Sequence, residues 1–379
     1  MGAAAVFITK PLYLSPLLGH VRGMTKPLYV SLGLMSGTSA DGIDAALIRS
    51  DGEDMVETLA AAFVPYPDDF RKRLLVCAHQ HQEDEAVRAE FSHWCQRACE
   101  AILSQSNLRP DFIASHGHTL NHRPDLGWTH QMDDPAALAS RFGIPVVSDF
   151  RQKDMQNGGQ GAPLVPVYHR VRGRGHPKPL AIVNIGGVSN ITLVDENDAM
   201  IAFDAGPGNA LMDDILQKTI GARYDHGGAL ALSGYRNTDL AEALLADPFF
   251  EKKGPKSLDR NHFAQRAAML DGLPLNDHLA TLVYVTALAI ARGILMHQPD
   301  CAECLLVGGG RKNKAIVDVL SQNLPCPVRD GDTAGFDSDF MEAEAFAYLG
   351  IRSFLGLPYS FPETTGVRAP TCGGVWTYP

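Results

Sequence analysis

One glycine- and hydroxyl-rich stretch near the start of the chain, Gly33 to Asp44, combines residue types that can bind an anion. Its glycines let the backbone approach a ligand, so that N–H groups can point at the anion, and the hydroxyls of Thr38 and Ser39 add donors. Asp41 and Asp44 would repel a bare phosphate, which favours a divalent cation between carboxylate and phosphate. An ordinary Gly/Asp β-turn is the alternative, and this stretch alone does not decide between the two.

A second candidate for chemistry is Asp204, which we expect at the end of a short strand over residues 201–204. A glycine-rich turn follows it, and a helix is expected to begin at Ala210. A carboxylate in this position is held rigidly beside the N–H groups of a helix start, which suits a general base facing a transferable phosphoryl group. An aspartate that only closes the turn is the alternative.

Two further sets of glycines each end an apolar stretch that is typical of a buried strand. They are Gly186, Gly187, Gly308, Gly309 and Gly310. A triple glycine after a strand lets a flat base or a ribose approach the backbone, although one such run is weak evidence. Together with the stretch at Gly33, these sets predict three turns that face a nucleotide. No Walker-type Gly-Lys-Ser/Thr motif occurs in the sequence.

Four neighbouring histidines, His116, His118, His122 and His130, give the main competing signal. Alternation along a strand would place His116 and His118 on one side, and His-x-His begins several zinc hydrolase sites. No partner motif for zinc follows later in the chain, so polar contacts to a sugar are the favoured interpretation.

The two halves of the chain are joined by the charged stretch Asp149–Asp154 and the glycine-rich stretch Gly158–Leu164. Charged residues beside a glycine-rich hinge are typical of an interlobe crossing that closes on a ligand. A flexible, solvated linker is the alternative.

Periodicity predicts that each half contains a strand, a glycine turn and a return strand, followed by further α/β units. The expected strands are 28–32, 44–48, 112–116, 144–149, 180–185, 189–194, 201–204 and 304–307, and the expected helices are 69–106, one from Asp134 with Pro135 at its first position, 279–297 and 340–354. The halves share no close sequence repeat, but the shared plan predicts a duplicated two-lobe nucleotide fold.

Composition limits the classes of protein that need considering. A chain of 379 residues is long for one hydrophobic core, so two lobes are expected. The net charge of -10 without any basic run argues against a nucleic-acid-binding face. The 7 scattered cysteines indicate reduced thiols and a cytoplasmic location. Within residues 1–26, the apolar stretch Ala3–Ile8 makes a poor signal peptide and is too short to span a bilayer.

Several motifs, in this order, resemble the anhydro-N-acetylmuramic acid kinase family of the hexokinase–actin–heat-shock ATPase superfamily. The matching stretches are Gly33–Asp44, Ser115–Thr119, Val147–Pro166, Asn184–Thr192, Phe203–Asp213, Leu305–Asn313 and Met341–Leu349. They span almost everything from Tyr29 onward. The resemblance implies a two-lobed ribonuclease-H-like, actin-like fold with ATP bound between the lobes.

The same resemblance implies the domain organisation. Residues 1–26 are an extension outside the fold, 27–149 form lobe 1, and 150–369 form lobe 2. Residues 370–379 are a tail that is expected to return to lobe 1.

The resemblance also implies a double reaction, in which water opens the 1,6-anhydro bridge of the sugar while ATP phosphorylates the O6 so released. The product would be N-acetylmuramic acid 6-phosphate, in the recycling of peptidoglycan sugars. ATP and Mg²⁺ are the implied cofactors, with Mg²⁺ held mainly by the phosphates and Asp41 as a candidate ligand. The implied partners are the sugar and ATP, without nucleic acid or membrane, and a homodimer is left open.

By resemblance, Asp204 is the catalytic base. The glycines Gly186, Gly187, Gly308, Gly309 and Gly310 bind the nucleotide, together with the phosphate loop of Gly37, Thr38, Ser39, Ala40, Asp41, Gly42, Ile43 and Asp44. The residues implied on the sugar side are His116, Thr119, Asp154 and Glu342.

Three positions depart from the family's usual pattern. Ala40 replaces a leucine, which indicates a packing change. His118 replaces a glutamine, and Lys153 replaces an arginine that could grip a carboxylate with two hydrogen bonds. The last two put the affinity for the sugar in question more than the chemistry.

Two further functions stay open on the sequence. An ordinary kinase of a reducing amino sugar would share the fold and the aspartate. A non-catalytic nucleotide-binding regulator would share the fold alone, although no basic helix-turn-helix segment precedes Tyr29.

Overall fold

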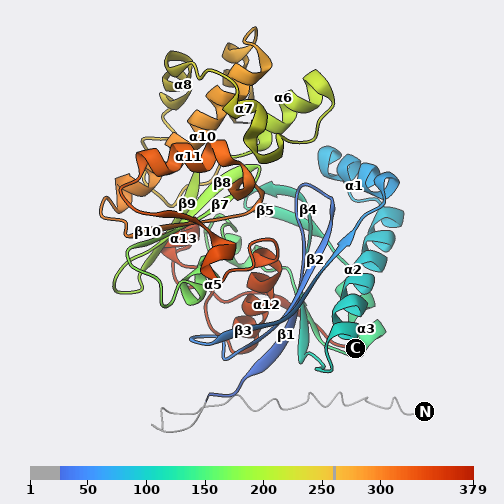
Figure 1. The fold of residues 1–379 in the computed structure, drawn as a ribbon. Coiled ribbons are helices and arrows are strands. Elements are labelled where there is room, and N and C mark those ends of the chain that lie inside the picture. Colours follow the sequence, from blue (N-terminus) through green and yellow to red (C-terminus); the bar gives the residue numbers. More distant parts are fainter. Residues whose placement is uncertain (1–25, 259–261) are drawn as a thin grey trace, which may run out of the picture.

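The computed structural model describes residues 26–258 and 262–379, which form two β-sheets with helices packed on them (Figure 1). The expectation for the N-terminal extension therefore lies outside the described residues, except for Lys26. The first sheet has the strand order β12-β6-β4-β1-β2-β3, and β5 pairs with β4. Its strands are β1 (Tyr29–Ser36), β2 (Gly42–Ser50), β3 (Val56–Pro65), β4 (Phe112–Arg123), β5 (Trp128–Met132), β6 (Val146–Ser148) and β12 (Val375–Thr377).

The second sheet has the order β11-β10-β7-β8-β9. Its strands are β7 (Leu180–Ile185), β8 (Val188–Val194), β9 (Met200–Pro207), β10 (Glu303–Val307) and β11 (Val328–Asp330). In both sheets three antiparallel strands in sequence order are extended by parallel strands on the side of the first, β4 and β6 in one sheet and β10 and β11 in the other. The prediction of a duplicated, two-lobed α/β fold is therefore confirmed by topology.

The first sheet carries helices on both faces. Against one face pack α1 (Asp68–Gln80), α2 (Glu85–Gln105) and α3 (Pro135–Phe142), in a core that includes the buried thiols of Cys95 and Cys99. Against the other face packs α12 (Met341–Phe354), in a core that it shares with α5 (Pro166–Arg172) and with side chains of β7 and β10 from the second sheet. Thus α12 and α5 lie between the two sheets (Figure 1).

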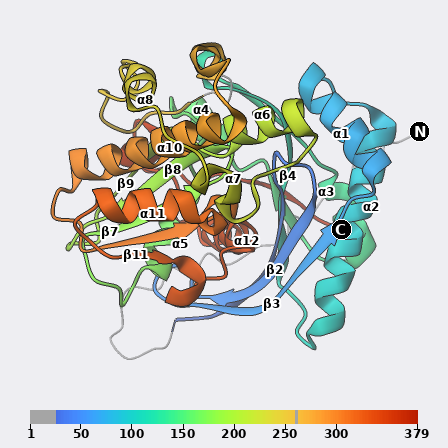
Figure 2. The ribbon, with the colours of Figure 1, turned by 45° about the horizontal axis from the view of Figure 1, so that its top comes forward.

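The outer face of the second sheet is covered by a separate group of helices, which Figure 2 shows over β7, β8 and β9. They include α6 (Ala210–Ile220), α7 (Ala229–Leu232), α8 (Thr238–Leu245), α10 (Leu275–His297) and α11 (Lys314–Asn323). The remaining α-helices of the described residues are short: α4 (Gln152–Gln156), α9 (Ala264–Ala267) and α13 (Pro362–Thr365). By length and hydropathy α10 could cross a membrane, but most of it is buried in the core of this lobe.

Several element boundaries differ from the sequence-based expectation. The expected helix 69–106 is two helices, because His81 ends α1 with φ 56° and the Asp84 side chain caps α2 by accepting from Val87 N. Strand β4 (Phe112–Arg123) continues past residue 116, where the expected strand ends. The predicted start of α3 is confirmed, with Asp134 as the cap and Pro135 first.

The C-terminal residues return to the first sheet, where β12 pairs antiparallel with β6. Helix α12 also packs on the first sheet, although it follows β10 and β11 of the second sheet in sequence. The residue boundaries proposed for the two lobes stay a prediction.

A close approach between β1 and α12 brings the two halves of the chain together. Gly33, expected in a turn, lies in the middle of β1, where a Cβ atom would be 2.0 Å from the backbone oxygen of Ala343 and 2.7 Å from the nitrogen of Ala347. Helix α12 also lies close to β4, where a Cβ added to Gly350 of the helix would be 2.8 Å from the Cβ of Ala114 on the strand. The absence of a side chain at Gly33 thus lets the helix backbone rest directly on the strand.

Gly33→Ala should therefore destabilise the protein by about 3 kcal/mol, because neither backbone can yield without moving the strand or the helix. Urea unfolding would measure the change. Gly127→Ala is the control, since Gly127 has φ 64° but no atom within 4 Å of an added Cβ, and it should cost only about 1 kcal/mol. Equal losses at the two positions would contradict the packing argument.

Candidate active site

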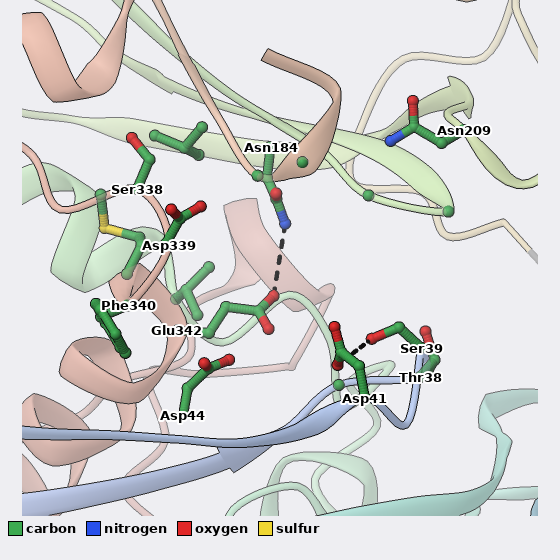
Figure 3. A pocket seen from close by; sticks show the side chains of 18 of the residues that line it. Thr38, Ser39, Asp41, Asp44, Asn184, Asn209, Ser338, Asp339, Phe340 and Glu342 are labelled. Atoms are coloured by element: carbon green, nitrogen blue, oxygen red, sulfur yellow. Dashed lines mark hydrogen bonds between the residues drawn. The ribbon is translucent and has the colours of Figure 1, made fainter. Parts of the chain in front are cut away.

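A cavity of about 610 Å³ lies between the two sheets (Figure 3). Predicted residues that line it are Gly37, Thr38, Ser39, Asp41, Asp44, Gly186, Gly187, Gly308, Gly309 and Glu342. Other lining residues, which sequence analysis did not assign, include Asn184, Asn209, Ser338, Asp339 and Phe340. The three predicted turns, which lie far apart in the sequence, are thus brought to one cavity.

The first turn connects β1 and β2 and exposes Thr38 and Ser39. It is closed by a hydrogen bond from Ala40 N to the oxygen of Gly37, and Ser39 Oγ donates to Asp41 Oδ1 at 2.8 Å. Three predicted ligand residues are buried and do not line the cavity: Ala40, Gly42 and Ile43. They support the turn from the interior of the protein.

The second and third turns are packed against each other at the ends of β7 and β10. Asn209 N donates to the oxygen of Gly186, and a Cβ on Gly208 would lie 2.2 Å from that oxygen. Gly308 has φ 75°, and a Cβ there would lie 2.2 Å from Asn184 Oδ1. Gly310 is buried, and a Cβ on it would meet the side chain of Ile185 at 2.2 Å, so it serves packing and does not line the cavity.

The cavity is lined by acidic side chains, with Asp41, Asp44, Asp339 and Glu342 from both halves of the chain. Neither lysine nor arginine occurs among its lining residues in the described chain. Burial raises the pKa of Asp44 to about 7, and the neighbouring carboxylates of Asp41 and Glu342 add to the shift. Burial likewise raises the pKa of Glu342. The surroundings of the cavity therefore disfavour the charged forms of Asp44 and Glu342.

One lining carboxylate is held differently. Arg311 is buried and contacts Asp330, Asp332 and Asp339, with 2.9 Å between its Nη1 and Asp339 Oδ1. Hydrogen bonds from Arg311 and Lys312 lower the pKa of Asp339. Asp339 thus presents a fixed negative charge to the cavity.

Asp204 lies inside β9 and not at its end, and it does not line the cavity. It is the register partner of Asn190 on β8, which pairs in turn with Asn184 on β7, so the three polar side chains share one face of the sheet. Asn184 lines the cavity and its Nδ2 lies 3.5 Å from Glu342 Oε1 (Figure 3). The row of polar side chains thus connects Asp204 to the cavity edge.

The carboxylate of Asp204 is held by the segment that covers β9. Leu258 N donates to Asp204 Oδ2 at 2.7 Å. Burial raises the pKa of Asp204 to about 7, against the opposing effects of this hydrogen bond and of the Lys256 ammonium. Burial also lowers the pKa of Lys256 to about 8.

His116, predicted to contact the sugar, has both ring nitrogens engaged by protein. Nδ1 lies 2.9 Å from the oxygen of Gly117, and Nε2 lies 3.1 Å from Arg151 Nε and 2.9 Å from its Nη2. A carbonyl can only accept and a guanidinium can only donate, so the ring is neutral with its proton on Nδ1. Burial and the Arg151 charge lower the pKa of His116, which agrees with the neutral form. His116 therefore positions Arg151.

Asp154 and Thr119 also lie outside the cavity lining. The buried carboxylate of Asp154 accepts from Gly161 N and from Thr365 Oγ1, both at 2.6 Å, so it fixes the glycine-rich segment between the halves. Thr119 on β4 lies 3.4 Å from Gln131 Nε2 on β5. Arg151, whose Nη1 donates to the oxygen of Gly161, is the charged group that His116 and this segment hold.

The four clustered histidines do not form a metal site. Their partners differ: Arg151 for His116, Ser36 for His118, Thr129 for His122 and Glu83 for His130. The expectation that His116 and His118 share a face is wrong, because Gly117 has φ 76° and breaks the alternation of β4. Within residues 26–258 and 262–379, no group of three or more His, Cys, Asp or Glu could hold a metal ion.

Two of the residues that the sequence left unassigned carried a detectable signal. Asn184 is a polar residue in an otherwise apolar strand, and Asn209 directly precedes the expected helix start. Arg151 stood in the predicted hinge, where nothing distinguished it from its charged neighbours. The position of Asp339 depends on its buried partner Arg311, which sequence spacing does not reveal.

Comparison with known sequences identifies one family. A family model described as anhydro-N-acetylmuramic acid kinase matches residues 29–379. The anhydro-N-acetylmuramic acid kinase of Methylorubrum extorquens is 44% identical over 92% of this chain and 99% of its own. That of Rhodospirillum rubrum is 41% identical over 91% of this chain and 93% of its own. Among solved structures, the activator of 2-hydroxyisocaproyl-CoA dehydratase from Clostridium difficile aligns with a TM-score of 0.43 at 11% identity, over 86% of this chain and 96% of its own.

The raised pKa of Asp44 predicts a pH-dependent stability. The pKa of Asp44 is about 7 in the folded protein and near 3.8 in the unfolded chain, so protonation of this carboxyl group favours the folded state. This contribution to the free energy of unfolding is fully present below about pH 4 and is lost as the pH rises through 7. Asp44→Asn, which mimics the neutral form, should raise the melting temperature of ligand-free protein at pH 8 by about 2 °C, and by less at pH 5.

Thermal melts at the two pH values measure this difference. Asp69→Asn, at an exposed carboxylate in the first turn of α1, is the matched control and should show no gain at pH 8. A gain at Asp44 that is equal at both pH values would contradict the predicted titration.

Proposed function

Because the chain belongs to the anhydro-N-acetylmuramic acid kinase family, we propose that ATP and the anhydro sugar meet at the interlobe cavity and that Asp204 is the catalytic base. In this reaction a water oxygen forms a bond to C1 of the sugar and gives its proton to Asp204. The bond between C1 and O6 breaks, and O6 takes the γ-phosphoryl group as the bond to ADP breaks. The observation that carries the assignment is the elevated pKa of Asp204, about 7, in a carboxylate fixed on the sheet face that leads to the cavity.

A base with this pKa is suited to its task. General base catalysis is most efficient when the pKa lies near the working pH, because the group is then largely deprotonated and still strongly basic. The hydrogen bond from Leu258 N to one carboxylate oxygen supports a fixed orientation of Asp204. Holding water and sugar in the attacking geometry supplies much of the rate.

The phosphates of ATP are assigned to the three glycine turns that line the cavity. Exposed backbone at Gly37, Gly186 and Gly308 offers N–H groups to phosphate oxygens, and the hydroxyls of Thr38 and Ser39 add donors. This assignment keeps Gly42, Ile43, Ala40 and Gly310 as residues that shape the turns from within.

Mg²⁺ fits the donor set of this cavity. ATP is negative, the cavity is lined by carboxyl groups, and neither lysine nor arginine occurs among the lining residues that the structure describes. Carboxylate oxygens of Asp41, Asp44 and Asp339 are hard ligands, and Mg²⁺ commonly takes one or two carboxylates together with phosphate oxygens. Bound with ATP, the ion would neutralise phosphate charge during transfer. It would also favour the charged form of Asp44.

The sugar is assigned to the side of the cavity where Glu342 contacts Asn184. Near this side, His116 accepts a hydrogen bond from Arg151, and the charges of Glu342 and Asp154 favour the charged form of Arg151. Thr119 stays a predicted sugar contact. A cytoplasmic location and the oligomeric state stay predictions as well.

A coupled assay of ADP release tests the function directly. Purified protein with ATP and Mg²⁺ is offered 1,6-anhydro-N-acetylmuramic acid, N-acetylmuramic acid or glucose in separate reactions. We expect turnover with the anhydro sugar alone. Activity only with a reducing sugar would retain the ATP site and discard the opening of the bridge.

Asp204→Asn should lower kcat by at least about 10³-fold and leave ATP affinity within about twofold, since the base acts in the transition state and belongs to none of the three nucleotide turns. Calorimetric titration with MgATP and the coupled assay measure the two quantities. For the native protein, kcat/KM should fall about tenfold per pH unit below pH 7, because protonation removes the base.

Asp239→Asn, in the first turn of α8, is the control and should retain native turnover and pH dependence. Substantial turnover by Asp204→Asn would show that another group accepts the proton. A flat pH profile between 5 and 7 would argue the same.

A further inference from the structure

We propose that His118 is a positioning residue for the turn Gly37–Asp41, acting through the buried hydrogen-bonded chain His118–Ser36–Tyr66, and that it makes no contact with the sugar. The inference rests on the proposed binding of ATP phosphates by that turn. It replaces the expectation that the histidine at this position alters sugar affinity.

The chain connects three side chains that are closed off from solvent. Ser36 Oγ lies 3.0 Å from His118 Nδ1 and 2.9 Å from the hydroxyl of Tyr66. The exposed fractions of Ser36, His118 and Tyr66 are 3%, 1% and 7%. None of the three lines the cavity.

This chain holds both ends of the turn. Ser36 is the last residue of β1 and directly precedes Gly37. At the other end, Tyr66 N donates to the oxygen of Asp41 at 2.9 Å. The Ser36 hydroxyl is fixed between the rings of His118 and Tyr66. It therefore connects the start of the turn to Tyr66, whose backbone N–H binds the end of the turn.

A local irregularity of the strands brings His118 to this position. Gly117 adopts φ 76°, and the register between β1 and β4 shifts between Leu34 and Ser36, so that Ser36 and His118 become direct partners. Such irregularities re-aim side chains, and here the ring points toward α2, where Phe91 lies 6.4 Å away between ring centroids. His116, two residues earlier, points instead toward Phe346 of α12.

Outside this chain the turn is held by the hydrogen bond from Ala40 N to the oxygen of Gly37, by that from Ser39 Oγ to Asp41, and by Arg71, which donates to the oxygen of Ser39. Thr38 and Ser39 are exposed, and Ala40 occupies the left-handed region with φ 50°. Backbone N–H groups bind phosphate well only when they converge on one point before the ligand arrives. Burial lowers the pKa of His118 to about 4, so the ring stays neutral and the chain keeps one form across physiological pH.

The test separates the Michaelis constants of the two substrates. His118→Leu, Ser36→Ala and Tyr66→Phe should each raise KM for MgATP about fivefold to tenfold and change KM for the anhydro sugar less than twofold. His118→Asn should recover most of the loss, because an asparagine places its amide near the position of Nδ1. The double variant Ser36→Ala/His118→Leu should be no worse than the poorer single variant, since both break one chain.

Matched controls distinguish a specific effect on the turn from a general loss of stability. Ser92→Ala removes another buried hydroxyl from the same core, one that the described residues leave without a hydrogen-bond partner, and it should leave both Michaelis constants unchanged. Tyr66→Phe removes a single oxygen, so it remains informative if His118→Leu fails to fold. Circular dichroism and thermal melts establish that each variant is folded at the assay temperature.

A separate variant distinguishes this proposal from the assignment of the turn. Gly37→Val has room to fold, because an added Cβ would meet only Ser39 Oγ at 3.6 Å, but it would block a phosphate. If Gly37→Val leaves KM for MgATP unchanged, the turn does not bind ATP. If it raises that KM and the chain variants do not, or if they raise KM for the sugar instead, the positioning role of His118 is refuted.

Discussion

The close contact between β1 and α12 at Gly33 is the constraint on which the rest of this structure depends. Because the strand has no side chain there, the helix backbone reaches the first sheet, and α12 becomes part of a core that includes β7 and β10 of the second sheet. The first turn of the helix then delivers Glu342 to the cavity. Two residues later, the buried carboxylate of Glu344 accepts hydrogen bonds from Thr58 on β3 and Tyr168 on α5, both at 2.5 Å.

The cavity itself is held at an electrostatic cost. Carboxyl groups from β2 and α12 face one another, neither lysine nor arginine is among the lining residues in the described part of the chain, and burial raises the pKa of Asp44 and of Glu342. Such destabilised groups are typical of functional sites, where a ligand of opposite charge offsets the repulsion. In the proposed function, Mg²⁺ bound with ATP would supply a charge of opposite sign beside these carboxyl groups.

Around the cavity, most buried polar side chains serve geometry more than chemistry. His116 fixes Arg151, Asp154 fixes the glycine-rich segment, Arg311 fixes Asp339, and Ser36 connects His118 to Tyr66. Each of these groups has its hydrogen-bonding capacity directed at other protein atoms, and burial makes an unpaired partner costly. The groups left to meet the substrates are therefore few and firmly oriented.

The sequence by itself determined the strands and helices with strong periodicity, the three glycine turns and the family, because these depend on residues that are close together in the chain. It placed Gly37–Asp41, Gly186–Gly187 and Gly308–Gly309 correctly in turns, and the structure brings these turns to one cavity. It could not assign His116, His118 and Asp154 their partners, since Arg151, Ser36 and Thr365 reach them only through the packing of distant segments. Nor could it foresee that Gly33 and Gly117 act inside strands, because their effects depend on which backbone lies opposite. Local patterns are written in neighbouring residues, whereas the direction in which a buried polar side chain points is decided by tertiary contacts.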